Sequence, residues 1–263
     1  MSQSVRSVDR ALEILLCFTR DEPTRSLTQI AEAINMSKTT VHRLLATLEN
    51  KRFITRDKTT GLYRLGLRFI EMASLVLQDV ELHRWAHPYL QRLLTEFGET
   101  VDLSVLDGSH VVYLEVIESP QRLKLAAAVG QRLPASFTAS GKALMAYLPE
   151  EQIRNILNEN LAGRTDPALR SIPEILEDLK RTAERGYAIA EQEYEEGINA
   201  VAAPILDTSK YPIASIAIVG PSFRLTADRL PALGESIQEM TKVISSEVGL
   251  TALSEIVTKT RPR

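Results

Sequence analysis

The pattern of apolar and polar residues between positions 27 and 46 predicts two short helices joined by a tight turn. Ile30 and Ile34 mark the apolar face of the first helix, and apolar residues resume at helical spacing from Val41 onward. Asn35 stands at the turn, where the backbone requires a residue that tolerates a positive φ. This pattern is typical of a helix-turn-helix.

The second helix of this pair carries hydrogen-bond donors on the side away from its apolar face. Ser37 is the expected N-cap, because its hydroxyl can accept from the free amides of the first turn. Donors of these kinds reach phosphates and base edges in a DNA major groove. The DNA contacts that we expect from the two helices are Thr28, Ser37, Lys38, Thr39, Thr40, His42 and Arg43. A plain corner between two helices, with a polar face that is only solvated, is the alternative.

Two short strand patterns follow, one around Phe53 and Ile54 and one around Tyr63, and a polar turn that contains Gly61 separates them. A hairpin directly after a recognition helix forms the wing of a winged helix. Basic side chains suit a wing to contact backbone phosphate or the minor groove. In this chain they are Arg56, Lys58 and Arg64.

Charge is divided unevenly along the chain, whose formal net charge is −3. Residues 1–66 contain 11 Lys and Arg against 7 Asp and Glu, a balance of +4, and the remainder contains 20 against 27, a balance of −7. A basic amino-terminal module on an acidic body is expected of a DNA-binding head. A winged helix that binds a protein partner is the rival interpretation, and the basic side chains of the second helix argue against it.

At 263 residues the chain has room for this head and one larger domain. We expect a winged helix-turn-helix at 1–66, a linker helix at 67–80, an effector-binding domain at 81–250 and a carboxy-terminal tail at 251–263. The single cysteine, Cys17, lies within an apolar helical pattern and is expected in the core. The sequence shows no signal peptide and no apolar run of about 18 residues, so we expect a cytoplasmic protein with no membrane partner.

Apolar residues continue at helical spacing from Leu67 to Phe97, with Pro88 near the start of a second segment. This surface is larger than a small head can cover. One use for it is to pack against the same helix of a second chain in a homodimer, and the alternative is to lie on the carboxy-terminal domain of its own chain. A dimer fits a near-palindromic DNA operator, because one winged helix contacts too few base pairs for selectivity.

From residue 100 the pattern changes to strands with helices between and after them. The strand patterns cover 100–107, 110–118, 123–130, 187–194, 199–206 and 211–220. The helical patterns cover 137–148, 172–185 and 226–248, and Gly186 is the expected C-cap of the second. Strands flanked by helices at both ends predict an α+β sensor domain with a largely antiparallel sheet.

One spaced set of residues in this second domain matches a known family. It consists of Gly186, Glu193, Ala200 and Asp207, and the segment 138–143 is similar to a second block of the same family. Together with the winged helix, these features make the chain resemble the IclR-type bacterial transcriptional regulators along nearly its whole length. The resemblance implies a winged helix-turn-helix, a linker helix and a GAF-like α/β effector-binding domain. It also implies a homodimer or homotetramer that binds double-stranded DNA.

Four positions depart from what the family pattern often holds. Relatives often have polar or soft side chains where this chain has Ala190, Ala200, Ala217 and Val219. Small apolar side chains leave volume for an effector and offer it no hydrogen bonds. With these departures, the resemblance implies an organic-acid effector with a sizeable apolar or aromatic part rather than a small oxo-acid.

Small residues stand where a helix is expected to begin, at positions 139–141. Free amides and the helix dipole favour an anion such as a carboxylate there, and close contact between helix and sheet is the alternative reason for small residues. The expected effector contacts are Ala139, Ser140, Gly141, Ala190, Glu191, Ile198, Ala200, Ala217 and Val219. For Glu193 we expect a structural hydrogen bond to backbone rather than catalysis.

An enzyme with an appended helix-turn-helix is the remaining rival. A phosphate-binding loop around the Gly-Lys pair would require Gly at position 136 and Ser or Thr at position 143, where this chain has Ser136 and Ala143. His83 and His87 are four residues apart on a helix, but Glu81 is the only carboxylate near them. We therefore expect no catalytic residue, no metal and no cofactor, and the sequence predicts a ligand-controlled transcriptional regulator.

Overall fold

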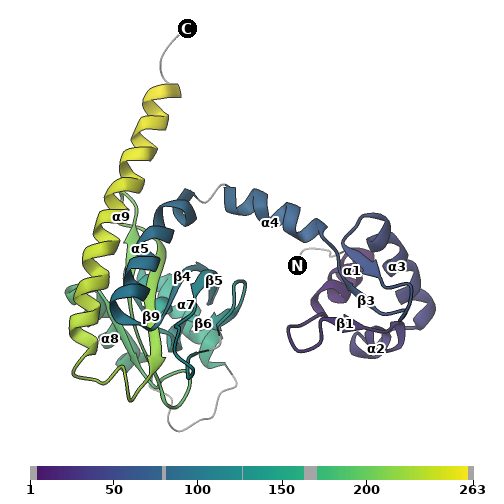
Figure 1. Cartoon of the computed structure of the whole chain (residues 1–263), viewed down its shortest axis with the longest axis horizontal. Coiled ribbons are helices and arrows are strands. Elements are labelled where there is room, and N and C mark those ends of the chain that lie inside the picture. The colour runs from purple at the N-terminus through teal and green to yellow at the C-terminus, as the bar shows by residue number, and fades with distance from the viewer. Residues whose placement is uncertain (1–4, 79–80, 126, 163–170, 260–263) are drawn as a thin grey trace. The chain divides into compact units, whose positions relative to one another are not determined.

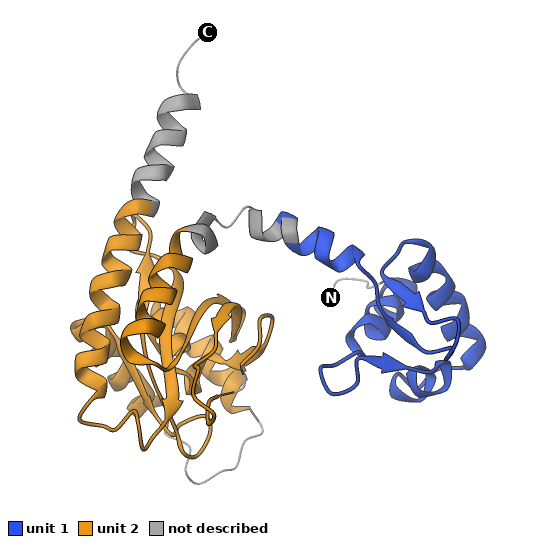
Figure 2. Ribbon diagram, in the orientation of Figure 1, with its two compact units in different colours: residues 1–80 blue, residues 81–263 orange. Residues whose placement is uncertain are grey.

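The computed structural model describes residues 5–78, 81–125, 127–162 and 171–259. It divides into two compact units, Met1–Val80 and Glu81–Arg263, which are coloured separately in Figure 2. Each unit has its own hydrophobic core, and each is described by itself. Among the described residues, no helix combines the length and the hydrophobicity that a membrane span requires.

The first unit is a small helical domain with a three-stranded sheet (Figure 1). Its elements are α1(Arg6–Leu16), β1(Thr24–Arg25), α2(Leu27–Ala33), α3(Lys38–Asn50), β2(Ile54–Arg56), β3(Tyr63–Leu65) and α4(Arg68–Gln78). All strand pairs are antiparallel, in the order β1-β3-β2. The expected helix pair and hairpin are present, and β1 is a third strand that the sequence did not predict. A strand of two residues has no periodicity that a sequence pattern can detect.

The core of the first unit joins its helices to the hairpin. Ile14, Ile30, Val41 and Leu45 are fully buried together. Cys17, which we expected in this core, is half-buried and packs at its edge. Burial raises the pKa of its thiol. This cysteine is therefore a small structural residue rather than a reactive one.

The second unit is built on a six-stranded antiparallel sheet in the order β6-β5-β4-β9-β8-β7. Helices α5 and α9 cover one face of the sheet, and α6, α7 and α8 lie on the other side (Figure 1). The strands are β4(Thr100–Asp107), β5(His110–Ile117), β6(Arg132–Pro134), β7(Ala188–Glu191), β8(Ile198–Leu206) and β9(Pro212–Pro221). The helices are α5(Glu81–Phe97), η1(Ala135–Phe137), α6(Ala139–Met145), α7(Glu150–Leu161), α8(Ile172–Arg185) and α9(Leu230–Lys259). The expected α+β class is confirmed.

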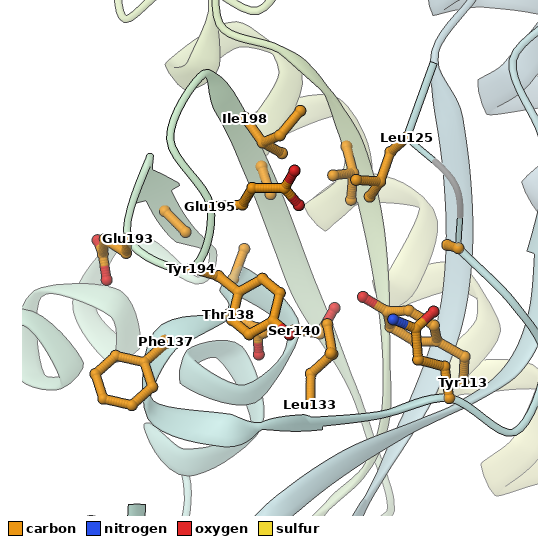
Figure 3. A pocket seen from close by; sticks show the side chains of 16 residues that line it. Tyr113, Leu125, Leu133, Phe137, Thr138, Ser140, Glu193, Tyr194, Glu195 and Ile198 are labelled. Atoms are coloured by element: carbon orange, nitrogen blue, oxygen red, sulfur yellow. The ribbon is translucent and has the colours of Figure 1, made fainter. Parts of the chain in front are cut away.

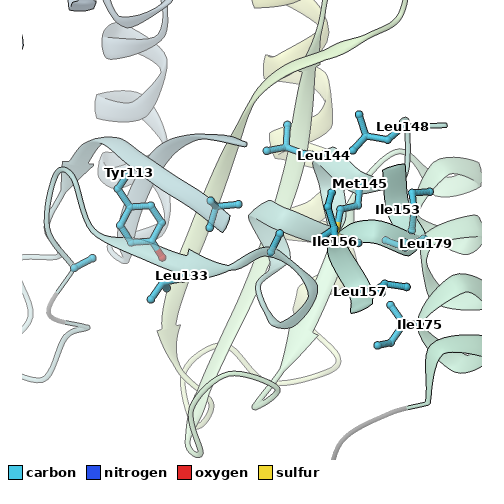
Figure 4. Packing of buried hydrophobic residues seen from close by; sticks show 13 residues of the cluster. Tyr113, Leu133, Leu144, Met145, Leu148, Ile153, Ile156, Leu157, Ile175 and Leu179 are labelled. Atoms are coloured by element: carbon cyan, nitrogen blue, oxygen red, sulfur yellow. The ribbon is translucent and has the colours of Figure 1, made fainter. Parts of the chain in front are cut away.

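A second hydrophobic cluster fills the space between the β5–β6 edge of the sheet and the helices on that side (Figure 4). Leu144 and Met145 of α6 meet Leu157 of α7 and Ile175 of α8 there, all almost fully buried. Each buried side chain of this size stabilises the fold by about 1.5–3 kcal/mol relative to exposure. The cluster therefore fixes the position of α6, whose first turn lines the cavity described below.

The secondary structure of this unit departs from the predictions in several places. No strand forms in the described part of 123–130, because Gly130 turns the chain at φ 80° and its amide donates to the carbonyl of Tyr113. Helix α7 was not predicted. Helix α9 starts at Leu230 and runs to Lys259, beyond the range expected for it, and Pro88 lies inside α5. The C-cap at Gly186, in contrast, is confirmed by its φ of 83°.

The pairing of β4 with β5 contains a register shift that decides which side chains face the helices on each side. Leu103 pairs with Glu115, but the next residue, Ser104, pairs with Tyr113. Residues two apart on a regular strand point to the same face of the sheet. An extra residue on one strand makes the side chains before and after it point to opposite faces. Glu115 accordingly meets His87 of α5, whereas Tyr113 lies on the α6 side.

Candidate functional site

The turn between α2 and α3 has the geometry that its residues predict. Asn35 adopts a φ of 49°, in the left-handed region. Ser37 is the N-cap of α3, and its Oγ accepts from the Thr40 amide at 3.4 Å. Both predictions are confirmed. A capping box between Ser26 and Gln29 fixes the start of α2 in the same way.

The expected recognition surface of α3 is exposed. Lys38, Thr39, His42 and Arg43 are all exposed, and they stand at helical spacing on the outer side of α3. Thr40 is half-buried, and its Oγ1 lies 2.9 Å from the Ser37 Oγ. Ser37 and Thr40 are therefore engaged with each other at the cap. Thr28 is half-buried on α2.

The wing between β2 and β3 is held by one carboxylate. The Asp57 Oδ1 accepts from the amides of Thr59 at 2.8 Å and Thr60 at 2.9 Å. These backbone hydrogen bonds, first that of Thr60, lower the pKa of Asp57. Gly61 completes the turn at a φ of 73°. The wing is thus a preformed turn.

The three basic residues expected on the wing are exposed: Arg56, Lys58 and Arg64. The guanidinium of Arg56 lies 5.4 Å from the centre of the Tyr63 ring, and its Nε donates to the Gly61 carbonyl at 3.4 Å. This side chain is therefore held along the hairpin. The exposed face of α3 and the wing together carry five basic side chains that can reach a polyanion, counting the two on α3 and leaving histidine aside.

The second unit encloses a cavity of about 620 Å³, part of it open to solvent, between the sheet and the start of α6 (Figure 3). Six of the expected effector contacts line it: Ala139, Ser140, Ala190, Ile198, Ala200 and Val219. The sequence did not identify the remaining lining residues, Tyr113, Leu125, Ala127, Gln131, Leu133, Phe137, Thr138, Glu193, Tyr194 and Glu195.

Three expected contacts do not line the cavity among the described residues. A Cβ on Gly141 would lie 2.0 Å from the Ala135 carbonyl oxygen, so this glycine serves the close contact that was the alternative explanation. Ala217 is fully buried beneath the cavity wall. Glu191 is exposed at the end of β7. A strand pattern predicts which face of the sheet a side chain points to, but not whether it is buried beneath other side chains.

Helix α6 presents its first turn to the cavity. Thr138 is its N-cap, and the Thr138 Oγ1 accepts from the Gly141 amide at 3.0 Å. The amides of Ala139 and Ser140 open the helix, where amides have no partner within the helix. The side chains of Thr138 and Ser140 reach the cavity from the same turn (Figure 3).

A buried carboxyl group lies directly behind this turn. The Ser140 Oγ donates to the Asp102 Oδ1 at 3.4 Å, and Asp102 on the central strand β4 is 1% exposed. Burial raises the pKa of Asp102 to about 7, against the lowering effect of hydrogen bonds from Ser104 and Ser140. Burial, with the charge of Asp102 as a further cause, also raises the pKa of Tyr113. Near neutral pH, Asp102 is therefore divided between its charged and neutral forms.

A buried lysine organises the far side of the same helix. The Lys142 Nζ donates to the Asp178 Oδ2 at 2.9 Å, to the Glu193 Oε1 at 2.6 Å and to the Ile189 carbonyl. The Lys142 side chain is 1% exposed. Glu193 therefore has a structural contact, with the Lys142 side chain. The strand expected over 187–194 ends at Glu191, before Glu193, because Gln192 turns the chain at a φ of 54°.

The histidine pair has no counterpart as a metal site in the described residues, where no group of three or more suitable ligands occurs. His87 Nδ1 lies against Glu115 Oε1. The side chain of His83 lies outside the described residues.

Comparison with known proteins identifies both domains. The IclR helix-turn-helix domain model matches residues 7–58, and the model of the bacterial transcriptional regulator IclR C-terminal domain matches residues 74–246. The HTH-type transcriptional regulator KipR of Bacillus subtilis is 31% identical over 95% of this chain and 100% of its own length. The transcriptional repressor IclR of Escherichia coli is 31% identical over 93% of this chain and 90% of its own length.

Solved structures show the same fold over both units. The crystal structure of the Thermotoga maritima IclR has a TM-score of 0.75 and 30% identity, and it covers 93% of this chain and 99% of its own. An IclR transcriptional regulator from Alicyclobacillus acidocaldarius has a TM-score of 0.79 and 26% identity, with coverages of 92% and 98%. Winged helix, second domain and sequence thus agree along the whole length, and the chain belongs to the IclR family of bacterial transcriptional regulators.

Proposed function

We propose that this DNA-binding transcriptional regulator is controlled by a small organic acid that binds in the cavity at the start of α6. The observation that carries the proposal is the composition of the cavity wall. Apolar side chains such as Leu125, Leu133 and Val219 line the cavity together with the start of α6. The protein acts in the cytoplasm, where the bacterial chromosome lies, and it works by binding rather than by catalysis.

Within this proposal, α3 enters the major groove and the wing contacts the backbone. The exposed donors Lys38, His42 and Arg43 support base and phosphate contacts from α3. The exposed Lys58 and Arg64 support phosphate contacts from the wing. The rival in which the winged helix binds a protein gains no support from so basic a face.

We propose that the functional unit is a homodimer or a homotetramer on a near-palindromic operator. Unpartnered apolar side chains on the first unit support this. On α4 and just before it, Leu67 is 75% exposed and Ile70 66% exposed, and on α1, Leu16 is 78% exposed. Exposed apolar side chains of this size are expected where another surface packs against them. A second copy of the chain would cover it and double the number of base pairs contacted.

The proposed effector has a carboxylate at the amides of Ala139 and Ser140 and an apolar part against Ala190, Ala200 and Val219. Helix N-termini favour anions because amides and dipole act together. A polar ligand oxygen directed at the alanines would lose its water without a partner, at a cost of about 1–3 kcal/mol. Small polar acids are therefore disfavoured relative to benzoate-like acids.

Two measurements test the proposal. Titration calorimetry of the full chain should show tighter binding of benzoate than of pyruvate or glyoxylate, and operator binding should change when the acid is added. The reverse order of affinities would show that the proposed effector class is wrong. Operator binding that never responds to an acid that does bind would remove the regulatory part of the proposal.

A further inference from the structure

The charges around the cavity are acidic. Among the described residues that line it, there is no lysine, arginine or histidine, and two are glutamates. Glu193 forms an ion pair with Lys142 at 2.6 Å, which Lys142 shares with Asp178, and Glu195 is exposed on the loop that follows. Asp102, behind Ser140, forms no ion pair within the described part of the chain. Asp102 is therefore a buried ionisable group directly behind the cavity wall, in hydrogen-bond contact with it through Ser140.

An effector carboxylate at the start of α6 would approach this aspartate through Ser140. The Ser140 Oγ already donates to the Asp102 Oδ1 at 3.4 Å, so the bound carboxylate and Asp102 would share one hydroxyl group. Two negative charges at such a short range in a buried site repel strongly, because little water screens them. A carboxylate and a neutral carboxylic acid, in contrast, form a favourable pair with one proton between them.

We propose that Asp102 is a specificity-determining residue of the cavity, which admits an effector carboxylate only when the Asp102 side chain carries a proton. A protein molecule whose Asp102 is ionised must then take up one proton from solvent when it binds the effector. The inference rests on the proposed effector class, and it adds a dependence on charge that the apolar wall cannot provide. An effector carboxylate binds when Asp102 is protonated, and an ionised Asp102 repels it.

The groups packed around Asp102 leave it as the titrating residue. On β5, burial and the charge of Asp102 raise the pKa of Tyr113, and Tyr194, from the loop after β7, acts on Tyr113 as well. From β9 the paired residue is Ala217. From α6, the residue that contacts Asp102 is Ser140, which does not ionise. The Lys142 ammonium is held by its three acceptors on the other side of the helix. Because burial puts the pKa of Asp102 at about 7, the proton is half present at neutral pH and is lost above it.

The test uses benzoate as the probe and titration calorimetry of the full-length protein between pH 6 and pH 9. For the natural sequence, affinity should be nearly constant below about pH 7 and should fall about tenfold per pH unit above it, as linkage to one proton requires. Asp102→Asn cannot ionise and keeps donors and acceptors of the same shape. Its affinity for benzoate should be independent of pH and, at pH 9, should exceed that of the natural sequence by about a hundredfold.

Asp107→Asn is the matched control, because it makes the same chemical change at the exposed end of the same strand, where Asp107 pairs with Arg132. It should keep the full pH dependence. A second measurement needs no variant: at pH 8, calorimetry in two buffers of different ionisation enthalpy should count close to one proton taken up per benzoate bound. This count decides the question if Asp102→Asn fails to fold.

The outcomes separate this inference from the proposal beneath it. Benzoate binding that is independent of pH, a proton count near zero at pH 8, or a pH slope that persists in Asp102→Asn would overturn the role of Asp102 alone. If neither protein binds benzoate at any pH while benzylamine binds, the effector class is overturned and the inference falls with it. Benzylamine has nearly the same shape with the opposite charge, so a cavity that prefers a cation would be revealed directly.

Discussion

Replacing Lys142 with methionine should strongly destabilise the second unit. Lys142 is the largest of the fully buried side chains, and its ammonium is shared by two carboxylates and one carbonyl. Methionine has a similar length and fills the same channel, so the loss of packing is small. The perturbation is therefore almost entirely the removal of one buried positive charge.

The magnitude follows from what is left behind. Breaking a buried ion pair by removing one partner costs about 3–5 kcal/mol, because the other charge stays buried without compensation. Here Glu193 loses the Lys142 ammonium, and so does Asp178, which keeps Arg181 at 3.9 Å. The Ile189 carbonyl also loses a donor. We expect Lys142→Met to lower the free energy of unfolding of this unit by about 3–5 kcal/mol.

The chain offers a specific probe for this unit, because its single tryptophan, Trp85, lies on α5. Urea titrations followed by tryptophan fluorescence therefore report on the second unit. Lys180→Met makes the same change on the exposed side of α8 and should shift stability by no more than about 0.5 kcal/mol. Adding Asp178→Asn and Glu193→Gln to Lys142→Met removes the orphaned charges and should restore most of the loss.

The rescue distinguishes charge from packing. If Lys142→Met costs less than about 1 kcal/mol at an unchanged urea slope, the buried ion cluster contributes little and the reasoning is refuted. If the single change is severe but the triple variant is no more stable, the loss comes from shape rather than from charge.

Three further changes test other parts of the molecule. Arg43→Ala should weaken operator binding by about 1–3 kcal/mol if the side chain reads a base, and a band-shift series that finds equal weakening on unrelated DNA would assign it to phosphate instead. Asp102→Asn should leave stability at pH 4 almost unchanged and raise it at pH 8 by as much as about 4 kcal/mol. This follows because the folded pKa of about 7 exceeds the unfolded value of 3.8, so the natural protein loses stability as pH rises between these values; equal urea midpoints at pH 8 would contradict it. Leu67→Glu with Ile70→Glu should convert the proposed dimer into a monomer of about 29 kDa by light scattering, and a dimer that survives both changes would place the interface elsewhere.

The helix-turn-helix could be predicted because its determinants are local. Helical spacing places Ile30 and Val41 in the core, and Asn35 and Ser37 specify the turn and the cap within a few residues of sequence. Each of these signals acts through neighbouring backbone, so a sequence pattern contains all the information that the geometry needs.

The cavity could be predicted only in part, because its shape depends on contacts between distant segments. Tyr113 lies on the cavity side because of a register shift, which the alternation of apolar and polar residues along the strand does not reveal. Asp102 contacts Ser140, which is 38 residues away in sequence. The apolar run at 123–130 has the composition of a strand. It is turned by Gly130 and hydrogen-bonded to Tyr113 instead, so tertiary contacts override local propensity.

Helix α6 connects the two buried charges that these experiments address. Its Ser140 donates to Asp102, and Lys142, two residues later, holds Glu193 on the loop that also brings Tyr194 and Glu195 into the cavity wall. A ligand can shift a conformational equilibrium only by its differential affinity for the two states. An acid at the start of α6 would gain such a difference in two ways, by the proton on Asp102 and by contact with a loop that Lys142 fixes. Asp102→Asn should therefore change how affinity depends on pH, whereas Glu193→Gln, which weakens the hold on the loop, should change affinity by a similar factor at every pH. Measured together, the two variants distinguish the effect of the Asp102 charge on effector affinity from the effect of the position of the loop that Lys142 holds.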